Sequence, residues 1–139
     1  MAVKVMNRQK ILVVDDNPVI TKTLSMKLTN AGYDVATAAD GTEAVSAART
    51  EKPSLILLDI SFPPDLGVPW DGFKVIEWLR RIEASKDIPI IVITGGDPAK
   101  YKDKSLATGA VAFFQKPIDG HSLLDVIKKT LTGAEKKAA

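Results

Sequence analysis

The sequence predicts an α/β fold in which a doubly wound, five-stranded parallel sheet lies between two layers of helices. Short apolar runs rich in β-branched residues alternate five times with segments whose apolar residues recur at helical spacing. The runs are almost continuously apolar, as in strands that are buried on both faces. Such alternation, with right-handed crossovers, gives parallel pairing and a three-layer sandwich.

The expected strands are short, and each ends at a polar residue or a turn. The third run is wholly apolar, the fourth is the richest in β-branched residues, and the second is the least apolar. Pro89, near the start of the fourth run, is expected to lie outside the hydrogen-bonded ladder. The expected strands are 10–14, 34–38, 55–58, 88–93 and 110–114.

The segments between these runs carry helix signals. Asn17 can cap the first helix, with Pro18 in its first turn and Gly32 after its end. The stretch from Asp40 to Glu43 resembles a capping box for the second helix.

Three further helices complete the pattern. The third is expected after Asp71, and the fourth, over 98–108, is polar and only faintly periodic. Leu124, Ile127 and Leu131 form the apolar stripe of the last helix.

Length and composition restrict the possible functions. A chain of 139 residues suits one domain, which we expect to span 10–132 after a leader at 1–9 and before a flexible tail at 133–139. A net charge of +2 does not indicate direct binding of nucleic acid. The absence of cysteine excludes disulfides and thiol chemistry, and a single histidine disfavours a His-rich metal site or a Ser-His-Asp triad.

The apolar runs are also too short for a membrane protein. None approaches the about 18–20 residues of a membrane span, and the first residues lack the apolar core of a signal peptide. We therefore expect a cytoplasmic protein without membrane insertion, whose chemistry relies on carboxylates.

Ionisable and hydroxyl side chains gather where four of the expected strands end. They are Asp15 and Asp16, Asp59, Thr94 and Lys116. In an open parallel sheet, functional groups lie beyond the carboxyl ends of the strands. Crowded carboxylates repel one another, and either the Lys116 ammonium or a hard divalent cation would relieve that repulsion. Mg²⁺ suits such a site because it binds one or two carboxylates and accepts further ligands from a phosphate.

Five motifs, correctly spaced along the chain, resemble one family. They are Leu12-Val-Val-Asp-Asp16, Leu57-Leu-Asp59, Ile93-Thr94-Gly95, Gly109-Ala110 and Lys116-Pro-Ile-Asp119. Over nearly its whole length the chain thereby resembles the receiver domain of two-component response regulators, in a stand-alone form similar to the chemotaxis receiver. This resemblance implies a flavodoxin-like (βα)5 fold with strand order 2-1-3-4-5.

The resemblance also implies a site. Asp59 is the expected phosphoryl acceptor, whose carboxylate attacks phosphorus to form an aspartyl phosphate. Asp15, Asp16, Asp59 and the backbone carbonyl of Ser61 are the expected ligands of Mg²⁺, or of Mn²⁺.

Two residues are expected to contact the phosphoryl group, Lys116 through its ammonium and Thr94 through its hydroxyl. The Lys116–Pro117 bond is expected to be cis. Thr94 and Phe113 would form a switch: Thr94 moves towards the phosphate and the ring of Phe113 turns into the vacated space. That repacking would remodel the face made by the fourth predicted helix, the fifth strand and the last helix.

The implied function is a phosphorylation-dependent signalling switch of a two-component phosphorelay. The phosphoryl group would come from a phosphohistidine on a sensor histidine kinase or a histidine phosphotransfer protein. The chain would catalyse its own phosphorylation and dephosphorylation but would not be a metabolic enzyme. Output would pass to a downstream protein target, or to an output domain if the chain belongs to a longer protein.

Three alternative functions fit the sequence less well. A phosphatase with an aspartyl nucleophile requires Asp-x-Asp, whereas Asp15 is followed by Asp16 and Asn17. A flavin site would require a Ser/Thr/Gly-rich loop after the first strand, which this chain lacks. A non-phosphorylated interaction module on the same fold is disfavoured because all five strand-end residues are intact.

The segment 62–70 departs from the family pattern. Asp71 follows Asp59 by twelve positions, more than is common, and the added residues are rich in proline. The segment is either a tolerated surface insertion or a lip over the phosphorylation pocket that selects the kinase or slows hydrolysis.

Overall fold

The computed structural model describes residues 9–60, 72–95 and 98–138. Its strands form a five-stranded, wholly parallel sheet of order β2-β1-β3-β4-β5, which confirms the predicted fold and strand order. The strands are β1 (Lys10–Val14), β2 (Asp34–Ala38), β3 (Leu55–Asp59), β4 (Ile90–Thr94) and β5 (Ala112–Gln115).

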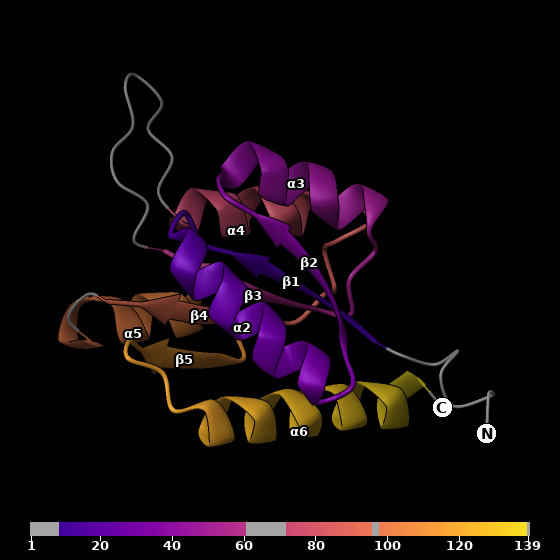
Figure 1. Ribbon diagram of the computed structural model, residues 1–139. Helices are drawn as coiled ribbons and strands as arrows, with labels where there is room; N and C mark the ends of the chain where they lie inside the picture. Colours follow the sequence, from indigo (N-terminus) through magenta and orange to yellow (C-terminus); the bar gives the residue numbers. More distant parts are fainter. Residues whose placement is uncertain (1–8, 61–71, 96–97, 139) are drawn as a thin grey trace.

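Helices cover both faces of this sheet (Figure 1). They are α2 (Pro18–Asn30), α3 (Gly41–Thr50), α4 (Gly72–Arg81), α5 (Pro98–Ala107) and α6 (Gly120–Ala138). Helices α3 and α4 contribute to one apolar cluster, and α2 and α6 contribute to the other. Successive residues of β1 alternate between the clusters: Ile11 and Val13 pack beneath α2 and α6, and Leu12 and Val14 beneath α3 and α4. This two-sided burial explains why the strands are apolar at every position.

The edges of three strands differ from the prediction. Strand β3 ends at Asp59, one residue later than expected. Strand β4 begins at Ile90, not at 88, and Pro89 lies outside it as expected. Strand β5 begins at Ala112, not at 110, because Ala110 still belongs to the turn that closes α5, where its N–H donates to the carbonyl of Ser105 at 3.3 Å.

Helix α6 also differs from the prediction. Leu123, Ile127 and Leu131 are its buried stripe, whereas Leu124 is half-buried. The backbone is helical through Ala138, although a tail was expected from residue 133. The last residues are mostly Ala, Glu and Lys, which have high helix propensity, so the helix continues beyond the stripe that packs on the sheet.

Within the described ranges, no helix combines the length and apolar content needed to cross a bilayer. Most of the expected leader, Ser61 and the segment 62–70 lie outside the described residues.

Candidate functional site

The parallel register brings three carboxylates together at one edge of the sheet. Val14 pairs with Leu58, so Asp15 and Asp59, the residues that follow them, lie side by side. Asp16 comes next along the chain. Each of the three aspartates offers a carboxylate oxygen, and these oxygens lie within 4.8 Å of one another. The sheet thus creates an oxygen-rich site from two strand ends.

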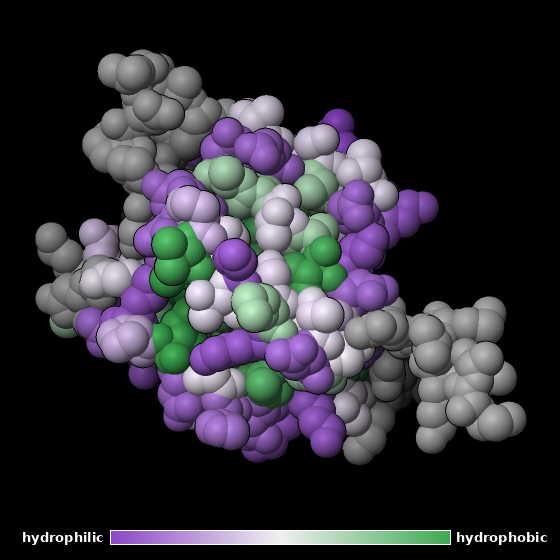
Figure 2. Space-filling model, in the orientation of Figure 1, coloured by the Kyte–Doolittle hydropathy of each residue, from purple (hydrophilic) through white to green (hydrophobic). Residues whose placement is uncertain are grey.

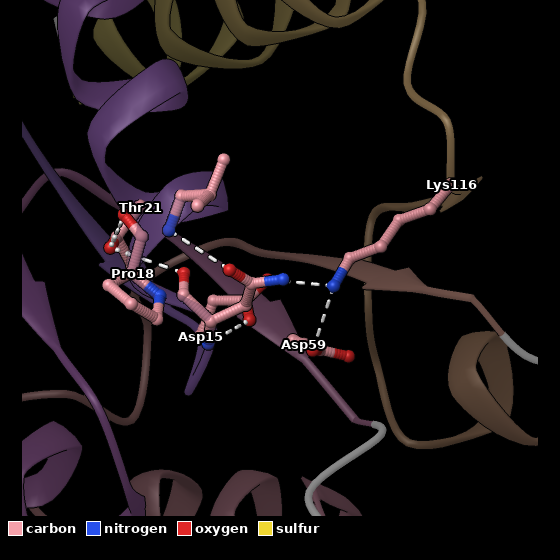
Figure 3. A network of polar contacts seen from close by, with 7 residues as sticks. Asp15, Pro18, Thr21, Asp59 and Lys116 are labelled. Atoms are coloured by element: carbon pink, nitrogen blue, oxygen red, sulfur yellow. Dashed lines mark hydrogen bonds and ion pairs between the residues drawn. The ribbon is translucent and has the colours of Figure 1, made fainter.

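Lys116 enters the same site from the loop after β5 (Figure 3). Its Nζ lies 2.8 Å from Oδ2 of Asp15 and 3.0 Å from Oδ2 of Asp59. Asp15 and Asp59 are each only 1% exposed. The other oxygen of Asp15 accepts a hydrogen bond from the backbone N–H of Asn17 at 2.9 Å. One ammonium therefore holds two buried carboxylates in position.

The electrostatics of the site favour cations. Burial by itself would lower the pKa of Lys116, but its hydrogen bonds to Asp15 and Asp59, and the charges of these carboxylates, raise the pKa above its usual value. Lys116 therefore stays protonated. Three carboxylates face this single ammonium, because Asp16 lies exposed beside the buried pair. The remaining negative charge suits a divalent cation that prefers oxygen ligands.

A pocket of about 450 Å³ opens over Asp59. This volume falls in the range of small-molecule sites and can admit a phosphoryl group. Thr94, at the end of β4, is 1% exposed, and its carbonyl accepts a hydrogen bond from the N–H of Lys116 at 2.8 Å. The lining residues are Asp16, Asn17, Asp59, Ile60, Thr94, Gly95, Tyr101 and Lys116.

The two expected switch residues project from the same face of the sheet. Thr94 pairs with Gln115, and Phe113 lies two positions earlier on β5. Because paired residues of parallel strands share a face and side chains alternate along a strand, Phe113 and Thr94 lie on one side. Phe113 is half-buried and packs against the cluster beneath α3 and α4.

Four pocket residues were not predicted to belong to the site: Asn17, Ile60, Gly95 and Tyr101. Asn17 was expected only as a cap of the first helix; it does cap α2, with Oδ1 accepting from the N–H of Val19 at 2.9 Å, and it also lines the pocket. Tyr101 lies in α5, the helix expected to be polar and only faintly periodic, but it lines the pocket, and its ring stacks on Phe73 with 6.4 Å between centroids. Its position in the first turn of the helix that follows the strand ending at Thr94 was the available signal.

The remaining expectations concern the backbone. The Lys116–Pro117 peptide bond, which was expected to be cis, is cis in the structure. The carbonyl of Ser61 and the segment 62–70 lie outside the described residues.

Comparison with known proteins agrees with this geometry. Residues 11–128 match the family model of the response regulator receiver domain. The chain is 35% identical over 122 residues to the DNA-binding dual master transcriptional regulator RpaA of Synechocystis, covering 88% of this chain and 48% of that protein. It is 38% identical over 127 residues to the alkaline phosphatase synthesis transcriptional regulatory protein PhoP of Bacillus subtilis, covering 91% and 50%. The chain thus spans about half the length of these relatives.

Solved structures show the same likeness. A CheY-like receiver domain protein of Methanospirillum hungatei superposes with a TM-score of 0.83 at 29% identity, covering 94% of this chain and 99% of that one. The receiver domain of the Pseudomonas aeruginosa sensor histidine kinase PA1611, which has a magnesium ion in its active site cleft, gives a TM-score of 0.78 at 28% identity, covering 90% and 98%. This chain belongs to the response regulator receiver domain family of two-component systems.

Proposed function

We propose that this receiver domain accepts a phosphoryl group on Asp59 and acts as a phosphorylation-dependent switch. The observation that carries the proposal is the buried Asp59 carboxylate, held by Lys116 at 3.0 Å beneath an open pocket. One oxygen of Asp59 attacks phosphorus while the bond from phosphorus to the donor breaks. The donor is a phosphohistidine, and its imidazole leaves with the electron pair of the P–N bond.

The three aspartates fit the binding of Mg²⁺. Asp15, Asp16 and Asp59 supply hard oxygen donors, the ligands that Mg²⁺ and also Mn²⁺ accept. The magnesium ion of the similar Pseudomonas aeruginosa receiver domain supports this assignment. The expected carbonyl of Ser61 would complete the protein ligands. When bound, the metal offsets negative charge on the phosphoryl oxygens.

Lys116 and Thr94 would hold the product. Once Asp59 is esterified, its former contact with the Lys116 ammonium can pass to a phosphoryl oxygen. The Thr94 hydroxyl would donate a hydrogen bond to another oxygen. Movement of Thr94 and inward rotation of Phe113, on the same face of the sheet, would then alter the surface of α5, β5 and α6. Hydrolysis of the aspartyl phosphate by water returns Asp59 and releases inorganic phosphate.

The partners follow from this chemistry. The donor would be a sensor histidine kinase or a histidine phosphotransfer protein, and the receiver of the signal would be a downstream protein or an output domain. We place the exchange in the cytoplasm, where a histidine kinase obtains its ATP. The switch would catalyse its own phosphorylation and dephosphorylation, without metabolic turnover.

The test uses a small phosphoryl donor. Wild-type protein with Mg²⁺ and acetyl phosphate should gain the mass of one phosphoryl group, and EDTA should prevent the gain. Asp59→Asn should gain none. Asp40→Asn, which changes an exposed aspartate on α3's cap, is the matched control and should behave as wild type. Equal phosphorylation of Asp59→Asn and wild type would contradict the proposal.

A further inference from the structure

An exposed tryptophan and two arginines line a groove between α3 and α4. The two helices lie side by side over one face of the sheet (Figure 1). The groove has a volume of about 410 Å³. Its lining residues are Val45 and Arg49 from α3, Trp78 and Arg81 from α4, and Ile82 just beyond it. Val45 and Arg49 are four positions apart on α3, and Trp78 and Arg81 are three positions apart on α4, so each pair lies on one side of its helix.

The two arginines of the groove differ from their neighbour Arg80. The guanidinium of Arg80 is fixed by the fold, because it donates to the carbonyls of Ile88 at 2.7 Å and Lys86 at 3.2 Å. In contrast, Arg49 and Arg81 are exposed, and neither forms an ion pair or a side-chain hydrogen bond within the described part of the chain.

Two carboxylates that closely follow these arginines in the sequence pair with lysines instead. Glu51, two residues after Arg49, pairs with Lys10 at 2.8 Å. Glu83, two residues after Arg81, pairs with Lys86 at 3.2 Å. Among the described residues, the lining of the groove therefore holds two guanidinium groups and no carboxylate.

The position of the arginines at helix ends does not explain the groove. Both lie in the last turn of their helices, where the helix dipole favours a cation. Lysine would satisfy that preference equally. The helix dipole also gives no reason for Trp78, which is 43% exposed, to lie beside the two arginines. Trp and Arg are the side chains most enriched among the residues that dominate binding at protein interfaces.

We propose that the α3–α4 groove binds an acidic amphipathic helix of a partner protein. Val45, Trp78 and Ile82 receive an apolar side chain of that helix, and Arg49 and Arg81 pair with carboxylates on either side of it. A protein segment suits the groove better than a small acid, because small-ligand sites enclose most of their ligand, whereas Arg49, Trp78 and Arg81 of this lining are exposed. This docking does not depend on phosphorylation of Asp59.

The test exchanges charges on both sides of the interface. Two fluorescein-labelled model helices share a leucine stripe, flanked by glutamates in one and by lysines in the other. Fluorescence anisotropy measures their binding to wild type, to Arg49→Glu/Arg81→Glu and to Lys22→Glu/Lys128→Glu. The last variant is the matched control, because it makes the same change in net charge on exposed residues of α2 and α6.

Wild type should prefer the glutamate helix by about tenfold, and the groove variant should reverse that preference. The control variant should retain the wild-type preference. Trp78→Ala, shown by circular dichroism to be folded, should weaken the glutamate helix by about tenfold without reversing the preference. Equal losses in the groove and control variants would overturn the proposal. Self-association of wild type that disappears in the groove variant would assign the groove to a second copy and would also overturn it.

Discussion

Aspartates serve two opposite purposes in two regions of this molecule. At the helix N-termini, Asp40 and Asp119 are exposed and accept backbone N–H groups, from Glu43 at 2.8 Å and from His121 at 3.1 Å. At the strand ends, Asp15 and Asp59 are 1% exposed and share the single ammonium of Lys116. The first pair satisfies donors that the helices leave open, whereas the second crowds like charges in a place shielded from water.

The capping aspartates stabilise the fold, whereas the strand-end aspartates are held in place by the fold at a cost in stability. A capping aspartate stabilises a helix by about 1 kcal/mol. Carboxylates that are buried together repel each other and lose hydration, which weakens the folded state. The strand-end cluster is therefore best explained by its chemistry. Figure 2 shows hydrophilic and apolar side chains intermingled on the face of the molecule that carries α2.

The largest expected effect comes from Asp59→Asn. This change should reduce phosphorylation by acetyl phosphate at least about 100-fold, since the nucleophile is lost. In the absence of Mg²⁺ it should also raise the free energy of unfolding by about 1 kcal/mol, because one of three clustered negative charges is removed. Urea denaturation measures the second effect. A loss of stability would mean that Asp59 supports the fold as the capping aspartates do.

Lys116→Ala should have the next largest effect. Removing the ammonium takes the Lys116 ion pair away from the buried Asp15 and Asp59. The free energy of unfolding should fall by about 2–3 kcal/mol, less than for a fully buried pair because the Lys116 side chain is 21% exposed. Mg²⁺ should restore part of this loss. Lys129→Ala, which breaks the exposed pair with Asp125 at 3.0 Å, should change stability by less than about 0.5 kcal/mol and should not respond to Mg²⁺.

Asp40→Ala should show the opposite profile to Asp59→Asn. Loss of the cap on α3 should lower the free energy of unfolding by about 1 kcal/mol, because the N–H of Glu43 loses its acceptor. The rate of phosphorylation should equal that of wild type. A slower rate of phosphorylation with an unchanged free energy of unfolding would contradict the assignment of Asp40 to the fold and not to the chemistry.

The smallest effect concerns the pH dependence of stability. The Ser122 hydroxyl and the His121 N–H donate hydrogen bonds to Asp119, and they lower its pKa below the usual 3.8. A lowered pKa in the folded state gives stability that is present above 3.8 and is lost as the pH falls through the folded-state value. The melting temperature of wild type should therefore approach that of Asp119→Asn once the pH falls below the folded-state pKa of Asp119. A constant difference down to the lowest pH would contradict the cap assignment.

The sequence was a good guide to the strand ends and a poor one to what surrounds them. Asp15, Asp59, Thr94 and Lys116 could be placed at one edge because parallel strands deliver their carboxyl ends to the same side of a sheet. The contact of Lys116 with both aspartates depends on the path of its loop, which no local pattern encodes. Tyr101 was missed because α5 is polar and weakly periodic.

The end of α6, its buried stripe and the α3–α4 groove could not be predicted from local sequence patterns. The extension of α6 beyond Leu131 reflects helix propensity without packing, and the shift of its buried stripe to Leu123 depends on how the helix rotates on the sheet. The meeting of Arg49 with Arg81 requires α3 and α4 to lie side by side, which is a tertiary property.

The most direct measurement locates the phosphoryl group. Borohydride reduces an aspartyl phosphate to homoserine, so peptide mass mapping after treatment with Mg²⁺, acetyl phosphate and borohydride identifies the modified residue. Our account predicts homoserine at position 59 alone, and none when EDTA replaces Mg²⁺. Homoserine at position 15 or 16, or its absence from position 59 in a phosphorylated sample, would contradict the assignment of Asp59 as the acceptor.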